Sequence, residues 1–229
     1  MEKTMKNYFY EDPYLKEIST TIKGAFEDDD RNCIHLWDNI FHPHGGGQKG
    51  DRGALLLPNG EQIIIVNTVK DKYSDNAVLL ITESEISDEL RGQAVECRLD
   101  WDFRYRQMRL HSTVHFHHCM LEKVLGKQLK PPKTSDIEDG FAFNRYDKTG
   151  ELTPEVVEKA NTELRDHIDK GAEITTYPDK EKEGFRWWEC LDYKIPCGGT
   201  HIANLNEVGE LEIKLTSKKG KPTVNFKLL

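Results

Sequence analysis

Two pairs of potential metal ligands stand out, because the members of each pair are four residues apart. His111 and His115 lie in a run expected to be helical, so their side chains project from one face and can share a cation. Cys197 and His201 bracket two glycines that let the backbone turn tightly. Together the pairs offer four nitrogen and sulfur ligands, a set that suits tetrahedral zinc. We predict one zinc ion per chain, with ordinary half-buried histidines as the alternative interpretation.

Three other kinds of zinc protein do not fit the pattern. A metalloprotease helix carries Glu directly after its first His, and Ser112 stands there. A nucleobase deaminase needs His-x-Glu and Cys-x-x-Cys, and the chain contains neither. A plain zinc finger would hold its two ligand pairs closer together in sequence.

A glycine-rich segment from Phe41 to Gly53 is the third chemical feature. It contains Gly45, Gly46 and Gly47, which let backbone approach a ligand closely, followed by Gln48, whose amide can donate or accept a hydrogen bond. When this segment is considered without the rest of the sequence, the alternative interpretation is a flexible turn.

Composition and charge limit the class of protein. The chain has 229 residues, of which 37% are hydrophobic and 31% charged, as in a globular protein. Its polar start predicts no secretory leader, and five scattered cysteines favour a reducing cytoplasm. We expect no membrane segment and no obligate protein partner.

The net charge of −8 is unevenly distributed. Residues 1–100 hold 11 Lys and Arg against 19 Asp and Glu, whereas residues 101–229 hold 21 of each kind. Basic groups gather in residues 101–133 and again near the C-terminus, and local basic patches can bind a polyanion despite the net charge. Solvated lysine faces are the alternative. The candidate nucleic-acid contacts are Arg104, Arg106, Arg109, Lys127, Lys130, Lys133, Lys218, Lys219 and Lys221.

The elements that position these groups follow from periodicity and turn signals. Asn59-Gly60 between apolar runs predicts a hairpin, and several short strands over the first hundred residues predict a small barrel or sandwich. A helix is expected from Asp100 or Asp102 to Gly126, and a second from Thr153 to Gly171. We expect residues 127–152 to be mostly loop, with one strand. Further strands are expected at 185–191, 211–215 and 223–228.

The predicted fold class is α+β. A β-barrel-like domain over residues 1–100 precedes an α+β domain over residues 101–229, in which the helices pack on an antiparallel sheet.

Three motifs follow one another along the chain: the Gly-Gly-Gly-Gln loop with Asp51 and Gly53, the run Met-Arg-Leu-His-Ser-Thr-Val-His, and Ile-Pro-Cys-Gly-Gly-Thr-His. In this order they resemble the AlaX family of alanyl-tRNA editing proteins. That family is similar to the editing domain of alanyl-tRNA synthetase and, more distantly, to that of threonyl-tRNA synthetase. The match extends over almost the whole chain and is closest to the medium-length form of the family.

The resemblance implies a cytoplasmic trans-editing hydrolase that cleaves serine or glycine from mischarged tRNA(Ala). His111, His115, Cys197 and His201 match the zinc-site positions of the family. The substrate contacts expected from the matching loops are Gly45, Gly46, Gly47, Gln48, Asp51, Gly198 and Gly199.

Chemistry leaves several roles open. Gln48, Thr113 and Thr200 are candidate polar groups that recognise a serine hydroxyl and support hydrolysis. Zinc can supply hydroxide or act as a template, and four protein ligands favour a template or structural role. A zinc-stabilised tRNA-binding module without hydrolysis is the alternative function. A synthetase fragment is not expected, because no adenylate-forming motif is present.

Overall fold

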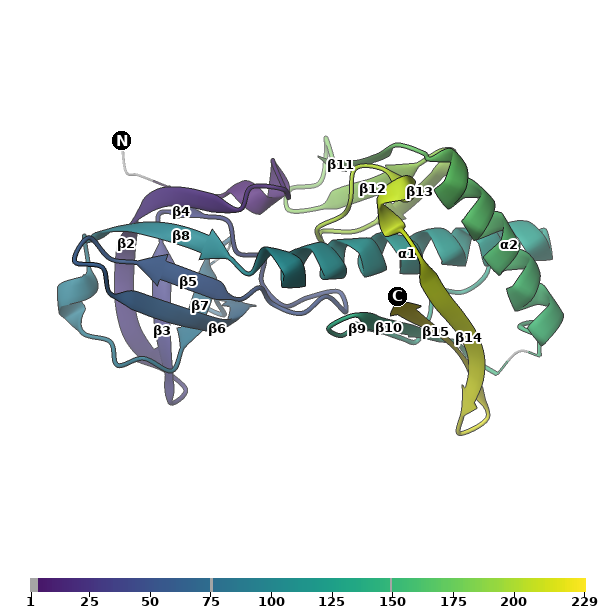
Figure 1. Cartoon of the computed structure of the whole chain (residues 1–229), viewed down its shortest axis with the longest axis horizontal. Helices are drawn as coiled ribbons and strands as arrows, with labels where there is room; N and C mark the ends of the chain where they lie inside the picture. The colour runs from purple at the N-terminus through teal and green to yellow at the C-terminus, as the bar shows by residue number, and fades with distance from the viewer. Residues whose placement is uncertain (1–3, 75, 149) are drawn as a thin grey trace. The chain divides into compact units, whose positions relative to one another are not determined.

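The computed structural model describes residues 4–74, 76–148 and 150–229 and divides the chain into two compact units (Figure 1). Unit 1 comprises Met1–Gly45 and Lys49–Arg104, and unit 2 comprises Gly46–Gln48 and Tyr105–Leu229. The first three residues of the polar start lie outside the described ranges. Within those ranges, neither α-helix combines the length and apolar character needed to cross a bilayer.

Unit 1 is built on a closed antiparallel barrel in the strand order β2-β3-β7-β6-β5-β8, which confirms the expected small barrel. The predicted hairpin is present: Leu55 of β5 lies opposite Ile63 of β6, and Gly60 in the turn has a φ of 89°. Inward-facing apolar side chains such as Ile34, Leu55 and Leu80 form the barrel core. The elements are β1 Lys6–Asn7, η1 Tyr8–Tyr10, β2 Glu17–Asp28, β3 Arg31–Leu36, β4 Asp38–Asn39, β5 Gly53–Leu56, β6 Gln62–Lys70, β7 Val78–Thr82, η2 Asp88–Leu90 and β8 Ala94–Leu99.

Unit 2 contains two antiparallel sheets, ordered β14-β15-β10-β9 and β11-β12-β13, and the helices α1 and α2. The predicted C-terminal hairpin is present, with Ile213 of β14 opposite Phe226 of β15. The elements are α1 Trp101–Leu125, whose first turn belongs to unit 1, β9 Thr134–Ile137, β10 Phe141–Arg145, α2 Pro154–Lys170, β11 Ile174–Pro178, β12 Arg186–Cys190, β13 Tyr193–Pro196, η3 Leu205–Val208, β14 Leu211–Lys218 and β15 Lys221–Leu228.

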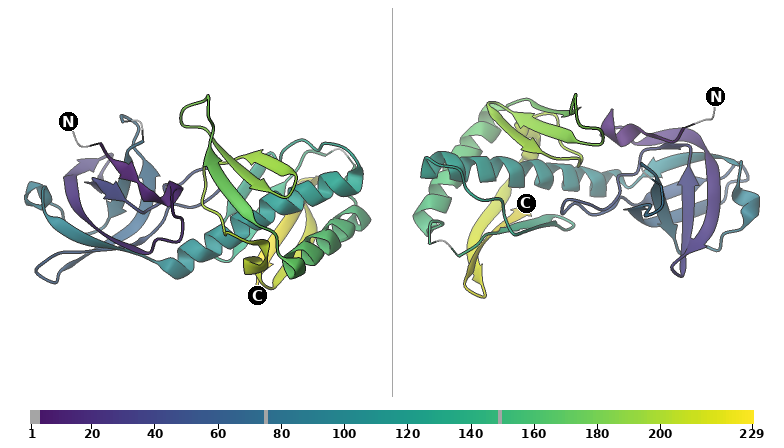
Figure 2. Two further views of the ribbon diagram at one scale, coloured as in Figure 1. Left: turned by 90° about the horizontal axis from the view of Figure 1, so that it is seen from above. Right: turned by 180° about the vertical axis from the view of Figure 1, so that it is seen from behind.

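Helix α1 lies between the two sheets of unit 2, and α2 lies beside it (Figure 2). Phe116 contacts Tyr193 of the three-stranded sheet, whereas the ring of His117 contacts Phe226 of the four-stranded sheet. His117 Nε2 also contacts Asn161 Oδ1 of α2 at 3.0 Å. Because neighbours cover α1 on several sides, most of its middle residues are buried, and no single apolar stripe marks its orientation.

The helix boundaries agree with the capping signals in the sequence. Asp100 Oδ1 accepts a hydrogen bond from Phe103 N at the start of α1, and Gly126, with a φ of 64°, follows its end. Thr153 Oγ1 accepts from Val156 N at the start of α2. These signals are local, which is why they could be read without knowledge of the fold.

The expectation for residues 127–152 was wrong in part. Two short strands, β9 and β10, occupy this segment and extend the sheet from β15. Neither β11 nor β13 was predicted. All four strands are only four or five residues long, so periodicity alone could not distinguish them from loops.

Candidate metal centre

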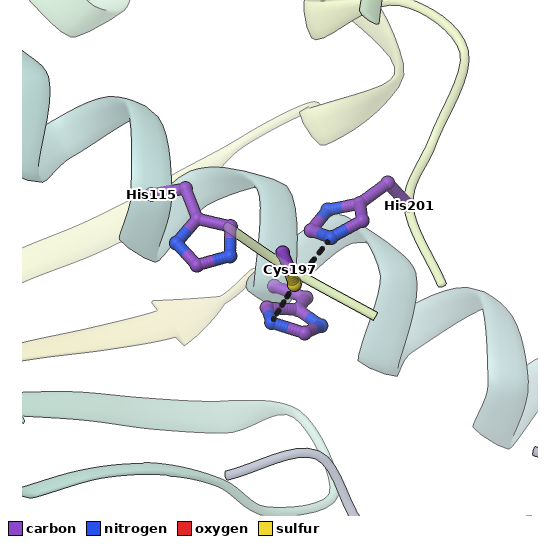
Figure 3. A group of neighbouring side chains, drawn as sticks. His115, Cys197 and His201 are labelled. Atoms are coloured by element: carbon purple, nitrogen blue, oxygen red, sulfur yellow. Dashed lines mark hydrogen bonds between the residues drawn. The ribbon is translucent and has the colours of Figure 1, made fainter. Parts of the chain in front are cut away.

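Four side chains from two segments of unit 2 converge on one point. Their ligand atoms all lie within 4.8 Å of one another, in a group that could hold one metal ion: His111, His115, Cys197 and His201. Cys197 Sγ is 3.5 Å from His111 Nε2 and 3.2 Å from His201 Nε2. Figure 3 shows His115 and His201 on either side of Cys197, their rings turned toward the sulfur.

The environment of these groups suits a cation. His115 Nε2 is buried and has no hydrogen-bond partner among the described residues. Burial, reinforced by His111 and His118, holds the pKa of His115 well below its usual value, so the imidazole is neutral at pH 7. Burial also raises the pKa of the Cys197 thiol to about 11. A bound cation would stabilise the thiolate and use the unpaired imidazole nitrogen.

The loop between Cys197 and His201 fits tightly against α1 at one glycine. A Cβ atom on Gly199 would lie 2.6 Å from His111 Nδ1 and 2.8 Å from Gln48 Oε1, far inside contact distance. The backbone N–H of Gly199 also points to Cys197 Sγ at 3.4 Å. Gly198, by contrast, is exposed and has open space around its Cβ position.

The glycine-rich segment contributes three residues to unit 2. Gly47, with a φ of 88°, lies so close to β9 that a Cβ would be 2.6 Å from Ser135 O. Ile137 N donates to Gly47 O at 2.9 Å, and Gln48 forms a parallel bridge with Ile137. This backbone contact places the fully buried Gln48 side chain between His111 and Thr200.

Two neighbours of the cluster were missed in the sequence. Ser112 Oγ lies 3.1 Å from His201 Nδ1 and accepts a hydrogen bond from Ile202 N. The Trp188 ring lies 5.5 Å from the His115 ring and 6.1 Å from the His201 ring. The histidine motif contains Ser112, so its position was a usable signal, whereas the contact of Trp188 requires the folded sheet.

Arg104 was expected to contact the tRNA and Asp51 to contact the substrate, but both side chains lie in the interior of unit 1. Their side chains are 0% and 1% exposed and form an ion pair inside unit 1. Arg104 also donates to Pro13 O and Ile40 O, and Asp51 also accepts from His42 N. A guanidinium held in this way cannot contact an RNA phosphate, and the Asp51 carboxylate is committed to Arg104.

Thr113 has a local role in the helix. It is fully buried, and its hydroxyl donates to Arg109 O at 2.8 Å. Thr200 is also buried, but its hydroxyl accepts from Gln48 Nε2 at 2.8 Å and therefore belongs to the network around the cluster. In the glycine-rich segment, Gly45 is half-buried and Gly46 is exposed.

The predicted basic patches differ in how much of their charge is paired. Around α1, the ion pairs are Arg106–Asp139, Lys123–Glu163, Lys127–Glu151 and Lys133–Asp147. Arg109 donates to Val208 O at 2.9 Å, and Lys130 is exposed. At the tip of the β14–β15 hairpin, Lys218 and Lys219 are exposed and Lys221 is half-buried. Lys148 Nζ lies 3.8 Å from the Cβ position of Gly220, so a lysine missed in the sequence adds to this tip.

Sequence comparison identifies relatives along almost the whole chain. The alanyl-tRNA editing protein AlaX-M of Pyrococcus horikoshii is 32% identical over 227 residues, which cover 94% of this chain and 93% of the relative. The chain belongs to the AlaX family of alanyl-tRNA editing proteins. This membership confirms the resemblance seen in the three motifs. No family model matches the chain.

Other relatives of this AlaX-family chain are longer than AlaX-M. AlaX-L of the same organism is 30% identical, over 95% of this chain and 56% of the relative. The alanine–tRNA ligase of Ignicoccus hospitalis is 30% identical, over 93% of this chain but only 24% of the ligase. The AlaX-related region is therefore one part of a larger ligase.

Proposed function

We propose that this chain is a trans-editing hydrolase that cleaves the ester between tRNA(Ala) and a wrongly attached serine or glycine. The observation that carries the proposal is the convergence of two histidines, a cysteine and a third histidine in a chain of the alanyl-tRNA editing family. The names of the relatives supply the class of substrate, and the cluster supplies a centre at which an ester could be held.

The donor set supports zinc as the metal. Nitrogen and sulfur ligands favour zinc over magnesium or calcium, which prefer oxygen. Tetrahedral zinc with ordinary bond lengths separates a sulfur ligand from a nitrogen ligand by about 3.6 Å. Cys197 Sγ lies 3.5 Å from His111 Nε2 and 3.2 Å from His201 Nε2, close to this separation. We therefore assign His111, His115, Cys197 and His201 as the ligands of one zinc ion.

Zinc at this centre would act as a Lewis acid toward the aminoacyl group or would orient it as a template. Four protein ligands fill a tetrahedral site, which favours the template role. The cluster contains no carboxylate. An aminoacyl ester is already activated, so positioning contributes more than a strong base, and we assign water activation to the terminal ribose hydroxyl or a main-chain group.

Recognition of serine requires a polar partner for its hydroxyl. A site built around a hydroxyl contact rejects the substrate that lacks it by about 10⁴–10⁵-fold, far beyond what an apolar pocket achieves. Thr200 is our candidate, because its hydroxyl oxygen accepts from Gln48 and its own proton is therefore directed to another acceptor. Thr113 is less suitable because it donates to the helix backbone.

For the tRNA phosphates we propose the β14–β15 tip, with the basic groups around α1 as a second contact region. Phosphate binding depends on unpaired positive charge close to the backbone of the RNA. The tip presents Lys218 and Lys219 to solvent, whereas several basic groups around α1 already hold acidic partners.

A deacylation panel tests the function. Ser-tRNA(Ala), Gly-tRNA(Ala) and Ala-tRNA(Ala) are incubated with the zinc-loaded protein and with protein stripped by a chelator. We expect rapid release of serine or glycine, slow release of alanine, and loss of activity on stripping. Binding of tRNA(Ala) without release of any amino acid would instead support the non-hydrolytic module.

A further inference from the structure

The side chain of Gln48 is completely buried and uses both of its polar atoms inside unit 2. Its Nε2 donates to Thr200 Oγ1 at 2.8 Å. Its Oε1 accepts from Thr200 N at 3.0 Å and lies 3.0 Å from His111 Nδ1. An amide committed in this way is a link between two protein segments, and it has no exposed atom to offer a substrate.

The orientation of the amide follows from the backbone of Thr200. A backbone N–H can only donate, so the Gln48 atom that faces it must be the carbonyl oxygen. The same oxygen faces His111 Nδ1. It cannot donate, so Nδ1 must carry a proton, and the neutral ring then has its lone pair on Nε2.

That lone pair is directed at the ligand cluster. His111 Nε2 is the ring atom that lies 3.5 Å from Cys197 Sγ. Ser112 contacts His201 Nδ1 in a corresponding position, but a hydroxyl can donate as well as accept, so that contact does not select a tautomer. Among these neighbours, the Gln48 amide alone determines which nitrogen of its histidine is protonated.

We propose that Gln48 is a positioning residue that holds His111 in its metal-binding tautomer and ties the loop of Cys197 to α1. The inference rests on the proposed metal site, and it replaces the expected direct contact between Gln48 and the substrate. Gly47 and Gly199 make the arrangement possible, because a Cβ at either position would collide with its surroundings. Partners of metal-bound histidines contribute about 10–100-fold to metal affinity.

The test compares zinc affinity in Gln48→Met, Gln48→Glu and a matched control. Methionine keeps the volume of the side chain but removes the acceptor, so zinc affinity measured against a competing chelator should fall about 10–100-fold. Glutamate keeps an acceptor for His111 Nδ1–H and for Thr200 N–H, so its affinity should stay within the same order of magnitude as the wild type. Gln107→Met is the control, because Gln107 is an equally buried glutamine whose Nε2 donates to Glu138 O.

A second measurement reports the tautomer in the metal-free protein. Nitrogen-15 spectra of labelled histidine should show His111 protonated at Nδ1 in the wild type, in Gln48→Glu and in Gln107→Met. Gln48→Met should show a mixture of the two tautomers. A merely structural role of Gln48 would alter stability without moving this signal.

The outcomes separate this inference from the proposed function. Wild-type zinc affinity and an unchanged His111 tautomer in Gln48→Met would overturn the positioning role, and lost deacylation in that variant would then return Gln48 to substrate contact. If Gln48→Met does not fold, a weakened zinc affinity in folded Gln48→Glu would overturn the role equally. A wild-type protein that binds no zinc would overturn the metal assignment itself.

Discussion

At the scale of single residues, the neighbouring Gly198 and Gly199 differ in whether the structure leaves space for a side chain. Both lie between Cys197 and His201, and a motif search treats them alike. In the structure, Gly199 is pressed against the His111 ring, whereas Gly198 faces open space and its φ lies outside the left-handed region. Close approach of the backbone is therefore required at one position only.

We predict that Gly199→Ala lowers zinc affinity by at least about tenfold, because the new methyl group displaces a ligand histidine or the loop. Gly198→Ala is the matched control and should bind zinc like the wild type. Chelator competition on both purified variants measures the difference. Equal affinities would mean that the loop moves aside without disturbing His111.

His35 is a buried histidine outside the metal centre. It lies on β3 with Nε2 at 3.2 Å from Asp71 Oδ2, and the Phe26 ring packs against it. Burial lowers the pKa of His35, with a smaller contribution from Lys23, although Asp71 acts in the opposite direction. The folded state therefore binds a proton less readily than the unfolded chain, whose histidines titrate near pH 6.5.

From this shift we predict that His35 reduces stability in acid. Below about pH 6.5 the unfolded chain takes up a proton that the folded barrel resists, so the free energy of unfolding falls as the pH falls. His35→Gln should make that decline shallower in urea titrations between pH 7 and pH 5. The same substitution at the exposed His44 is the control. Parallel curves for wild type and His35→Gln would contradict the prediction.

At the scale of elements, α1 combines two functions that compete for its surface. It presents His111 and His115 to the cluster, and it also forms the buried layer between two sheets. A carbonyl in its middle, Val114 O, accepts from Asn144 Nδ2 of β10. α2 has a simpler role, since it packs beside α1 and carries none of the four ligands.

For α2 we predict that Thr153→Ala lowers the free energy of unfolding by about 1 kcal/mol, because Thr153 Oγ1 caps Val156 N. Zinc content should not change. Thr162→Ala, at an exposed position of the same helix, should have a smaller effect. Urea titrations and metal analysis of both variants test the prediction, and equal losses of stability would show that the cap contributes nothing specific.

At the scale of the whole molecule, charge is divided along the chain. The acidic excess lies in residues 1–100, and the remaining residues are balanced overall. Ion pairs with acidic residues reduce the effective positive charge around α1. At the tip of the β14–β15 hairpin, by contrast, exposed lysines lie close together, and Lys148 is near them. A polyanion responds to this local field and not to the net charge.

We predict that replacing Lys218, Lys219 and Lys221 together by Ala weakens tRNA binding. The slope of log affinity against log salt concentration should become shallower by about 0.7 to 0.9 for each phosphate contact that is lost. For the triple variant, the total change in this slope should be about one to three. Hydrolysis of a minimal aminoacyl-adenosine should change little. Replacing Lys159, Lys170 and Lys180 instead changes the net charge equally and serves as the control. An unchanged slope in the hairpin variant would favour contacts around α1.

The sequence alone was sufficient for features that depend on neighbouring residues. The spacing of His111 and His115, the helix ends at Gly126 and Thr153, and the hairpin at Asn59-Gly60 follow from the geometry of one turn of helix or one reversal of the chain. The three motifs also predicted the family, which the comparison with AlaX-M confirms.

Tertiary structure decided what depends on distant partners. The sequence predicted a surface position for Arg104, whereas in the structure its side chain is buried and pairs with Asp51. Gln48 reaches His111 only because its backbone pairs with Ile137. The short strands β9 and β10 likewise become recognisable through their pairing in the sheet. The physical reason is that burial and hydrogen bonding depend on which segments meet in space, and local sequence patterns do not contain that information.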